Sequence, residues 1–157
     1  MPTLNHTAQK EESQLPQASS ETTIARPRGE VFAYLADAEH DGEWRPGVIE
    51  VTRVSGDGVG TRYRQIVSGP RGRRIDADIE ITEYQPDRRL AFRTVTGPVR
   101  PSGSYDLDDV HGHTRVRFRL TAELNGLKKL LMPMVRKTMA TEVRNLDNLK
   151  KRLEAQQ

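Results

Sequence analysis

The sequence predicts an α+β domain in which a curved antiparallel β-sheet of about seven strands wraps around one long C-terminal α-helix. Three observations support this fold class. Strand-like segments follow one another with only short turns between them, an amphipathic segment ends the chain, and the other helical pattern is short. Strands joined by short turns pair antiparallel, and a sheet with one apolar face has to bury that face against another element. The C-terminal helix is the one large partner available.

The length of 157 residues suits a single domain. The first 19 residues are polar, with almost no apolar side chains that could offset the entropy lost on ordering. We therefore expect a disordered tail over residues 1–19 and one folded domain over residues 20–155.

The domain begins with an expected short strand over residues 21–25. Pro27 then stands at a favourable helix start, and apolar residues at helical spacing predict a helix over residues 28–36. Residues 37–43 are polar and contain a glycine, so they form either a break or a second short helical turn.

Glycine and proline turns separate the strand-like segments that follow. The expected strands span residues 48–55, 60–68, 73–84, 89–96, 101–108 and 114–124. Alternation is clearest in residues 73–84, where Ile75, Ala77, Ile79 and Ile81 alternate with charged residues. This alternation predicts one apolar face and one solvated, charged face.

The C-terminal segment carries apolar residues at three- and four-residue steps from Leu127 to Leu153. Pro133 lies inside this pattern, and proline removes a hydrogen bond from a helix interior. The helix is therefore either kinked near Leu130 or begins near Met132.

Several short motifs resemble those of a known superfamily. They are Ile24-Ala25-Arg26-Pro27, Val31-Phe32-Ala33-Tyr34-Leu35, Trp44-Arg45-Pro46-Gly47, Gly58-Val59-Gly60-Thr61 and Leu146-Asp147-Asn148-Leu149. Over about residues 20–154 the chain resembles the SRPBCC superfamily, which includes START domains, birch-pollen-allergen-like proteins and the polyketide cyclase/dehydrase group. The resemblance implies the helix-grip fold, with an apolar cavity between the sheet and the long helix and one or two short helices between the first two strands.

Members of this superfamily bind lipids, sterols, polyketides or plant hormones, and some are cyclases, aromatases or dehydratases. No invariant catalytic motif can be carried over, so the resemblance implies only where the cavity lies. The two-histidine, one-carboxylate iron site of the ring-hydroxylating members is not found in this sequence.

Alternation along the strands and the helix predicts which residues face the cavity. The predicted ligand-contacting residues are Trp44, Tyr63, Gln65, Ile79, Phe92, Thr94, Tyr105, Phe118, Leu131, Met134 and Thr138. The polar ones among them either satisfy one another or contact the ligand, and Trp44 either closes one end of the cavity or anchors the core. This face carries no carboxylate, and phenols with a pKa near 10 are donors rather than bases at neutral pH, which argues against acid–base catalysis.

Arginines cluster along the second and third of these strands and in the turn between them. They are Arg62, Arg64, Arg71, Arg73 and Arg74. The cluster could bind phosphate or nucleic acid, but acidic residues on the neighbouring strand favour a salt-bridged, solvated face. Aromatic residues make up 5% of the chain, too few for a base-stacking platform, so no nucleic-acid partner is expected.

The remaining features argue against metals, cofactors and membrane spans. His111 and His113 in a tight turn could bind a metal weakly, but the sequence specifies no third and fourth ligand, so we expect no metal and no cofactor. We expect the acidic residues around His40 to form solvated surface, with a gate or an acid–base group as the alternative. The chain has no cysteine and no long apolar run, which favours a cytoplasmic protein without a transmembrane segment.

The sequence therefore favours the binding or transport of a small hydrophobic or amphipathic molecule, polyketide-like or lipid-like, by a monomer or homodimer. The first alternative is a polyketide cyclase, aromatase or dehydratase, and the second is a protein-interaction module. The identity of the ligand depends on the shape of the cavity, which the pattern does not fix.

Overall fold

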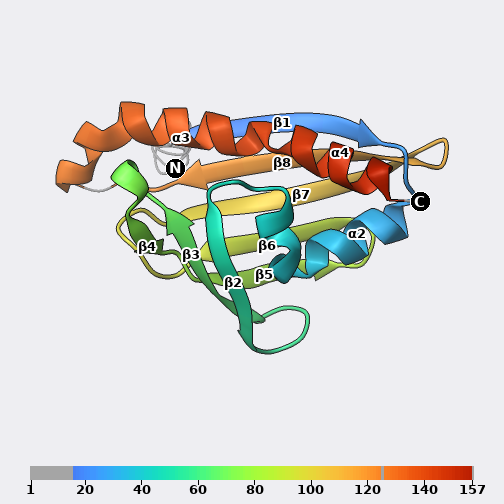
Figure 1. The fold of residues 1–157 in the computed structure, drawn as a ribbon, viewed down its shortest axis with the longest axis horizontal. Coiled ribbons are helices and arrows are strands. Elements are labelled where there is room, and N and C mark those ends of the chain that lie inside the picture. The colour runs from blue at the N-terminus through green and yellow to red at the C-terminus, as the bar shows by residue number, and fades with distance from the viewer. Residues whose placement is uncertain (1–15, 125, 157) are drawn as a thin grey trace, which may run out of the picture.

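The computed structural model describes residues 16–124 and 126–156, which form one curved antiparallel sheet covered by a layer of helices (Figure 1). The strands are β1 (Gln17–Ile24), β2 (Val48–Ser55), β3 (Arg62–Ser68), β4 (Arg74–Asp76), β5 (Ile79–Gln85), β6 (Arg89–Thr94), β7 (Pro101–Val110) and β8 (His113–Ala122). The α-helices are α2 (Arg28–Ala36), α3 (Met132–Arg144) and α4 (Leu146–Ala155), and the 3₁₀ helices are η1 (Ala38–Glu43), η2 (Pro70–Gly72) and η3 (Gly126–Leu131). The predicted helix-grip fold is confirmed.

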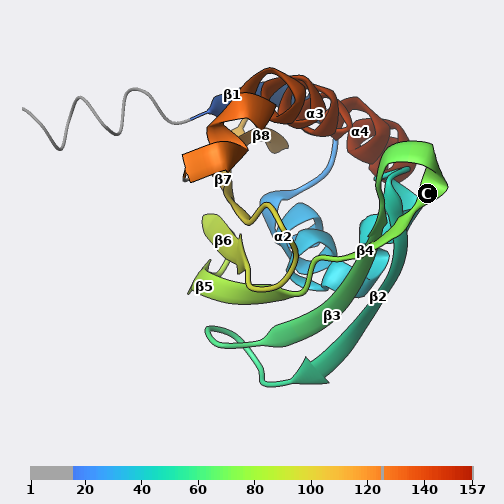
Figure 2. The same cartoon turned by 90° about the vertical axis from the view of Figure 1, so that its left-hand side faces the viewer.

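The strand order is β1-β8-β7-β6-β5-β3-β2, and β4 pairs with β3. Figure 2 shows the sheet curling from β1 and β8 under the helices round to β3 and β2 on the opposite side. Directly opposite residues share a face of the sheet, and the register places Phe118 and Leu90 opposite Tyr105 on its two neighbouring strands. All three are buried between the sheet and the helices, so the concave face carries the core.

The first strand is longer than the sequence predicts. It begins at Gln17 rather than at residue 21, and it pairs with β8 from Gln17 opposite Thr121 to Ile24 opposite Thr114. Backbone hydrogen bonds of an edge strand do not depend on apolar side chains, so polar residues can extend it. The strand therefore takes in residues 17–19 of the expected tail, while residues 1–15 lie outside the described residues.

The strand expected over residues 73–84 is interrupted, which corrects the prediction. It is divided into β4 and β5 because the Asp78 carboxylate accepts a hydrogen bond from the backbone N–H of Gln65 at 3.1 Å, where a ladder carbonyl would otherwise stand. The backbone N–H of Asp78 in turn donates to the Thr96 hydroxyl at 2.7 Å. The Asp78 side chain thus takes the place of one ladder carbonyl, while the backbone N–H of Ala77 still donates to the Gln65 carbonyl at 2.8 Å.

The C-terminal helix is divided into two. Pro133 lies in the first turn of α3, where a missing N–H leaves no helical hydrogen bond unmade, so the predicted alternative of a start near Met132 is confirmed. The predicted long C-terminal helix is confirmed, with a single residue, Asn145, separating its two parts, α3 and α4. There the backbone N–H of Asn145 donates to the carbonyl of Glu142 at 3.1 Å, a three-residue step that tightens the chain locally.

The outer face of the sheet carries salt bridges between neighbouring strands, as predicted for the arginine cluster. Arg62 lies 2.8 Å from the carboxylate of Glu80 across the β3–β5 pair. The register places Asp106 opposite Arg117, but the Arg117 guanidinium pairs with Glu21 of β1 at 3.1 Å. Such exposed pairs each contribute little to stability.

Candidate functional site

Aromatic side chains cover the middle of the concave face. The rings of Tyr105 and Phe118 stack with their centroids 4.5 Å apart, and Trp44 packs edge-on against both at 6.3 Å. Phe92 lies 6.1 Å from Tyr105 and stays partly accessible. A Cβ atom at Gly103 would lie 2.4 Å from the Phe92 ring, so the glycine makes room for it. These predicted residues therefore form one aromatic floor.

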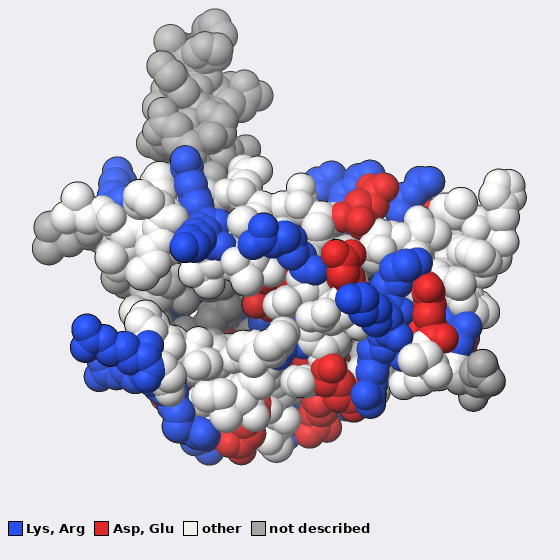
Figure 3. Space-filling view, turned by 45° about the horizontal axis from the view of Figure 1, so that its top comes forward, with Lys and Arg blue, Asp and Glu red and all other residues white. Residues whose placement is uncertain are grey.

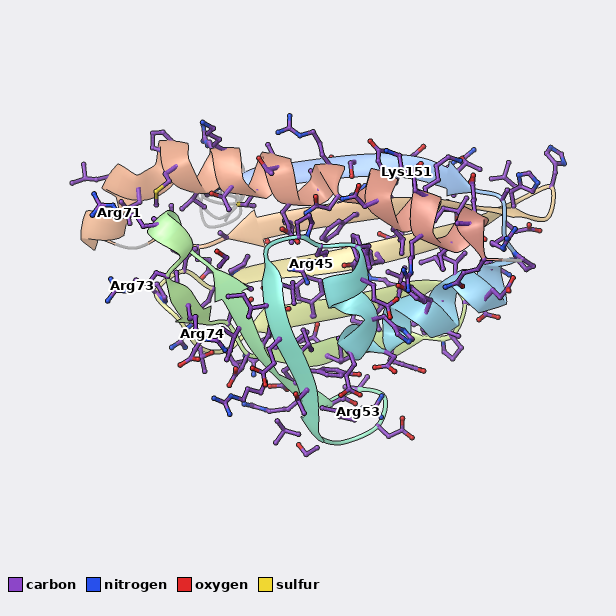
Figure 4. All side chains as sticks on the ribbon, in the orientation of Figure 1. Arg45, Arg53, Arg71, Arg73, Arg74 and Lys151 are labelled. Carbon is purple, nitrogen blue, oxygen red and sulfur yellow. The ribbon has the colours of Figure 1, made fainter. Side chains whose placement is uncertain are left out.

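A buried ion cluster lies against this floor. The Arg45 guanidinium donates to the Asp41 carboxylate of η1 at 2.9 Å and to the Glu142 carboxylate of α3. It also donates to the side-chain carbonyl of Gln65 on β3 at 3.3 Å. The Arg45 side chain is only 11% exposed, and Figure 4 shows it between the sheet and the helix layer. One arginine thus joins η1, α3 and the sheet.

Burial changes the titration of this cluster. Desolvation raises the pKa of Asp41 from 3.8 to about 6, although the charge of Arg45 opposes the rise. Desolvation would lower the pKa of Arg45, but Glu142 and Asp41 more than offset it and raise the pKa overall. Burial, and then the charge of Asp41, raises the pKa of Tyr105 well above 10. The phenol therefore stays protonated, while Asp41 changes charge close to neutral pH.

Two donors on the aromatic floor make no hydrogen bond to a described residue, and the one whose atom is fully buried is the Nε1–H of Trp44. Trp44 is 2% exposed, and its Nε1–H has no partner within residues 16–124 and 126–156. The hydroxyl of Tyr105, which is 3% exposed, makes no hydrogen bond to these residues either. Buried donors are almost always paired with protein or water. Both groups are therefore free to meet an oxygen atom of a bound molecule or of water.

Strand β3 contributes two of the polar residues predicted on this face, and both form hydrogen bonds within the protein. The Tyr63 hydroxyl donates to the backbone carbonyl of Ala36 at 3.3 Å. The Gln65 amide donates to the backbone carbonyl of Ala77 at 3.0 Å and accepts from Arg45. Their polar groups hold the walls of the site together, so neither is left without a partner for a ligand.

The remaining predicted residues divide between the interior and the rim. Ile79 and Thr94 are buried directly opposite each other on β5 and β6. Leu131, Met134 and Thr138 were expected to face inward, but the first two are 41% and 49% exposed and Thr138 is exposed as well. The buried side chains of α3 lie one position later in the sequence than the predicted ones. The three residues therefore lie on the exposed edge of the helix layer, which we call the rim of the site. Figure 3 shows the surface hollowed between the helix layer and the sheet.

The concave face of the sheet was predicted to carry no carboxylate, and the two carboxylates beside the aromatic floor come from the helix layer instead. Asp41 of η1 and Glu142 of α3 both pair with Arg45, and strand alternation could not indicate them because it describes the sheet alone. The acidic segment at residues 37–43 was interpreted as solvated surface. The sequence does contain a pattern that could have indicated Glu142. This residue follows Met134 and Thr138 at steps of four residues, so it lies on the same face of the helix.

His40, next to Asp41, faces the other way. Its ring stacks on Tyr34 with centroids 4.4 Å apart, beside a cleft of about 250 Å³ between α2 and α4. The Tyr34 hydroxyl donates to Glu43 at 2.6 Å. The acidic segment therefore sends Asp41 inward and keeps His40 and Glu43 outside the cavity.

Within the described residues, no three histidine, aspartate or glutamate side chains gather as a metal site would require. Across the same residues, the helices are too short or too polar to span a bilayer.

The sequence profile of the family described as "Polyketide cyclase / dehydrase and lipid transport" matches residues 16–154. The chain belongs to this family. The match covers nearly all of the described structure, so the predicted resemblance to the polyketide cyclase/dehydrase group of the SRPBCC superfamily is confirmed. No curated protein matches the sequence.

Solved structures share the fold of this polyketide cyclase/dehydrase family member. TTHA0849 from Thermus thermophilus is 26% identical with a TM-score of 0.77, over 90% of this chain and 100% of that one. The Zhui aromatase/cyclase from Streptomyces sp. R1128 is 18% identical with a TM-score of 0.73, over 90% and 94% of the two chains. A START superfamily protein from Mycobacterium smegmatis is 14% identical with a TM-score of 0.73, over 90% and 99%. The last two likenesses concern the fold alone.

Proposed function

We propose that the protein binds a small hydrophobic or amphipathic molecule, polyketide-like or lipid-like, between the concave sheet and α3. The observation that carries this proposal is the pair of unpartnered donors, Trp44 Nε1 and the Tyr105 hydroxyl, on a floor that is otherwise apolar. An apolar site with a few convergent polar groups is the usual form of a small-molecule site.

The charge of the cluster restricts the polar end of the ligand. Arg45 already faces two carboxylates, Asp41 and Glu142, so the cluster offers no unpaired positive charge to an anion. A neutral oxygen, such as a ketone, quinone or hydroxyl oxygen, can accept from Tyr105 and Trp44 without displacing an ion pair. The apolar body of the ligand then extends toward Phe92 and the rim of α3.

Native mass spectrometry of the purified protein, followed by denaturing extraction and mass identification, tests this proposal. We expect a defined apolar molecule that carries at least one neutral oxygen. If the protein is empty and also takes up no fluorescent apolar probe, the proposal is wrong and the protein-interaction module becomes the better hypothesis.

A second candidate is a cyclase, aromatase or dehydratase, which the titration of Asp41 favours. A carboxyl with a pKa of about 6 beside a protonated phenol is a suitable general base and acid near neutral pH. Ionised Asp41 could take a proton from the carbon between two carbonyl groups while Tyr105 donates a hydrogen bond to the enolate oxygen. Returning that proton to a departing hydroxyl group would release water.

Turnover of a poly-β-ketone thioester separates the two candidates. If the protein is an enzyme, Tyr105→Phe lowers turnover by about a hundredfold, because it removes one donor to the oxyanion. Tyr63→Phe is the matched control, since the Tyr63 hydroxyl is held by the Ala36 carbonyl, and we expect it to keep near-normal turnover. A wild-type protein that binds the thioester without converting it excludes this candidate.

The proposal also covers the cellular location of the protein and its oligomeric state. A cysteine-free chain favours a reducing, cytoplasmic location, which cell fractionation tests. We propose a monomer or homodimer without nucleic acid, and light scattering with and without DNA measures both properties.

A further inference from the structure

The first turns of the C-terminal helices leave three large apolar side chains in solvent. Leu130 is 80% exposed, Met134 49% and Leu131 41%. We call these three residues the apolar lip. They follow one another on η3 and α3 at the end of the molecule that faces the viewer in Figure 2. Neighbouring apolar side chains exposed to this degree mark an interaction surface more often than scattered single ones.

Exposed cations stand on both sides of the lip and of the hollow beside it. They are Arg71, Arg73 and Arg74 of the η2–β4 segment, and Lys129 and Lys137 of the helix layer. We call these five residues the basic rim. Of these five residues, Arg74 alone forms an ion pair within the described chain, with Glu50 at 3.4 Å. This part of the arginine run is therefore solvated but mostly not salt-bridged. Figure 4 shows the three arginines at the same end of the sheet, and Figure 3 shows basic side chains on both sides of the hollow.

The backbone of η2 presents one of these cations at its tip. Arg71 has φ 60° and ψ 28°, the left-handed region that residues other than glycine seldom adopt. Gly72 also has positive φ, so the chain turns sharply here. No carboxylate among the described residues pairs with Arg71. The conformation therefore keeps its guanidinium available at the end of the molecule.

We propose that the apolar lip and the basic rim dock on an anionic lipid bilayer, with the hollow facing the membrane. Apolar side chains that enter the interface between headgroups and acyl chains, flanked by lysine and arginine at headgroup level, are the features by which a helix binds such a surface. A broad anionic plane can meet both sides of the hollow at once. An acidic protein is less favoured because Leu130 projects from a helical turn instead of lining a groove. The inference goes beyond ligand binding, since docking does not require an occupied cavity.

Flotation of the full-length protein with phospholipid vesicles tests the inference. The vesicles are either neutral or contain about a third of anionic lipid, at salt concentrations of roughly 0.1 and 0.5 M. We expect binding to the anionic vesicles at the lower salt concentration, and a loss of about tenfold or more on neutral vesicles or at the higher salt concentration. Equal binding to both kinds of vesicle, or to neither, overturns the proposal.

Two pairs of variants locate the surface. Leu130→Asp combined with Met134→Asp, and Arg71→Glu combined with Arg73→Glu, should each weaken binding by about tenfold or more. Val59→Asp is the matched apolar control, because Val59 is 64% exposed in the β2–β3 loop, and Arg119→Glu on the outer face of β8 is the charge control. Both controls should bind as wild type does. All the altered side chains are exposed, so circular dichroism and the urea midpoint should stay unchanged.

Other occupants of the surface would give different results. A dimer that forms without vesicles and is lost in the Leu130/Met134 variant would assign the lip to a second copy of the chain and overturn the proposal. Binding to polyglutamate but not to anionic vesicles, lost in the Arg71/Arg73 variant, would assign the rim to an acidic protein and overturn it as well.

Discussion

At the scale of single residues, the site is organised by Arg45. Its guanidinium is shared by carboxylates from η1 and α3 and by the Gln65 amide from the sheet. Removing one partner of a buried ion pair leaves an uncompensated charge, whereas an exposed pair can be broken with little effect. The ion cluster should therefore dominate the energetics of the cavity wall.

Arg45→Ala should lower the free energy of unfolding by about 3–5 kcal/mol, because Asp41 and Glu142 stay buried without their cation. Arg62→Ala breaks an exposed pair with Glu80, in which the Arg62 side chain is 51% exposed, and should cost less than about 1 kcal/mol. Urea unfolding followed by circular dichroism measures both. Similar losses for the two variants would show that the cluster is not a stabilising unit.

Asp41 should make stability depend on pH. Its pKa rises on folding from 3.8 to about 6, so between these pH values the folded protein holds a proton that the unfolded chain releases. The contribution of this group to stability is therefore complete below about pH 4, falls as the pH rises to about 6, and stays constant above that. The fall amounts to at most about 3 kcal/mol.

Urea unfolding of wild type and Asp41→Asn at several pH values isolates this effect. The variant cannot titrate at position 41, so the difference in unfolding free energy between the two proteins should shift against wild type as the pH rises from about 4 to 6. A difference that stays constant over this interval would mean that Asp41 keeps an ordinary pKa.

At the scale of elements, alternation and periodicity predicted which segments exist, and side-chain hydrogen bonds decided where they end. The β4–β5 interruption depends on Asp78 reaching the Gln65 N–H, a contact between strands that no local pattern encodes. Pro133 did carry positional information, because proline fits the first helical turn, and α3 begins there. The break at Asn145 has no comparable signal, since asparagine is common in helices as well as at their ends.

The Phe92 side chain of β6 packs tightly over Gly103 of the neighbouring strand β7. Gly103→Ala would place a Cβ atom 2.4 Å from Phe92 Cζ and 2.9 Å from Leu120, so we expect a loss of about 1–3 kcal/mol or a displaced Phe92 ring. Gly47→Ala is the control, because nothing lies within 4 Å of the position that its Cβ atom would take, and it should change stability by less than about 0.5 kcal/mol. Equal losses of stability in the two variants would mean that the aromatic floor can accommodate an added methyl group without strain.

At the scale of the whole molecule, the sequence predicted the fold better than the site. Strands that follow one another with short turns leave few topologies, which is why the helix-grip fold could be predicted. The aromatic floor could also be predicted, because Tyr105 and Phe118 follow strand alternation. Asp41 and Arg45 could not, because they stand in a 3₁₀ helix and the loop after it, where no periodicity fixes direction. Met134 was predicted to face inward but is 49% exposed, because the buried face of α3 begins one residue later, at Val135.

Ligand binding should be visible as stability of the whole domain. A ligand that binds only the folded state at about a hundred times its Kd raises the free energy of unfolding by about 2.7 kcal/mol. Adding the extracted molecule to emptied protein should therefore raise the thermal midpoint. Met134→Asp alters an exposed rim residue and should keep the midpoint of the empty protein while reducing this gain. An unchanged gain would place the ligand away from the α3 rim.

The chain also contains a built-in optical reporter. Trp44 is its single tryptophan, and it lies at 2% exposure against Tyr105 and Phe118, with its backbone carbonyl accepting a hydrogen bond from Asn148 of α4 at 3.2 Å. Intrinsic fluorescence excited at the indole band therefore comes from one position, where sheet, 3₁₀ helix and C-terminal helix meet. Emission wavelength and quenching would report occupancy of the aromatic floor and separation of α4 from it, without any label attached.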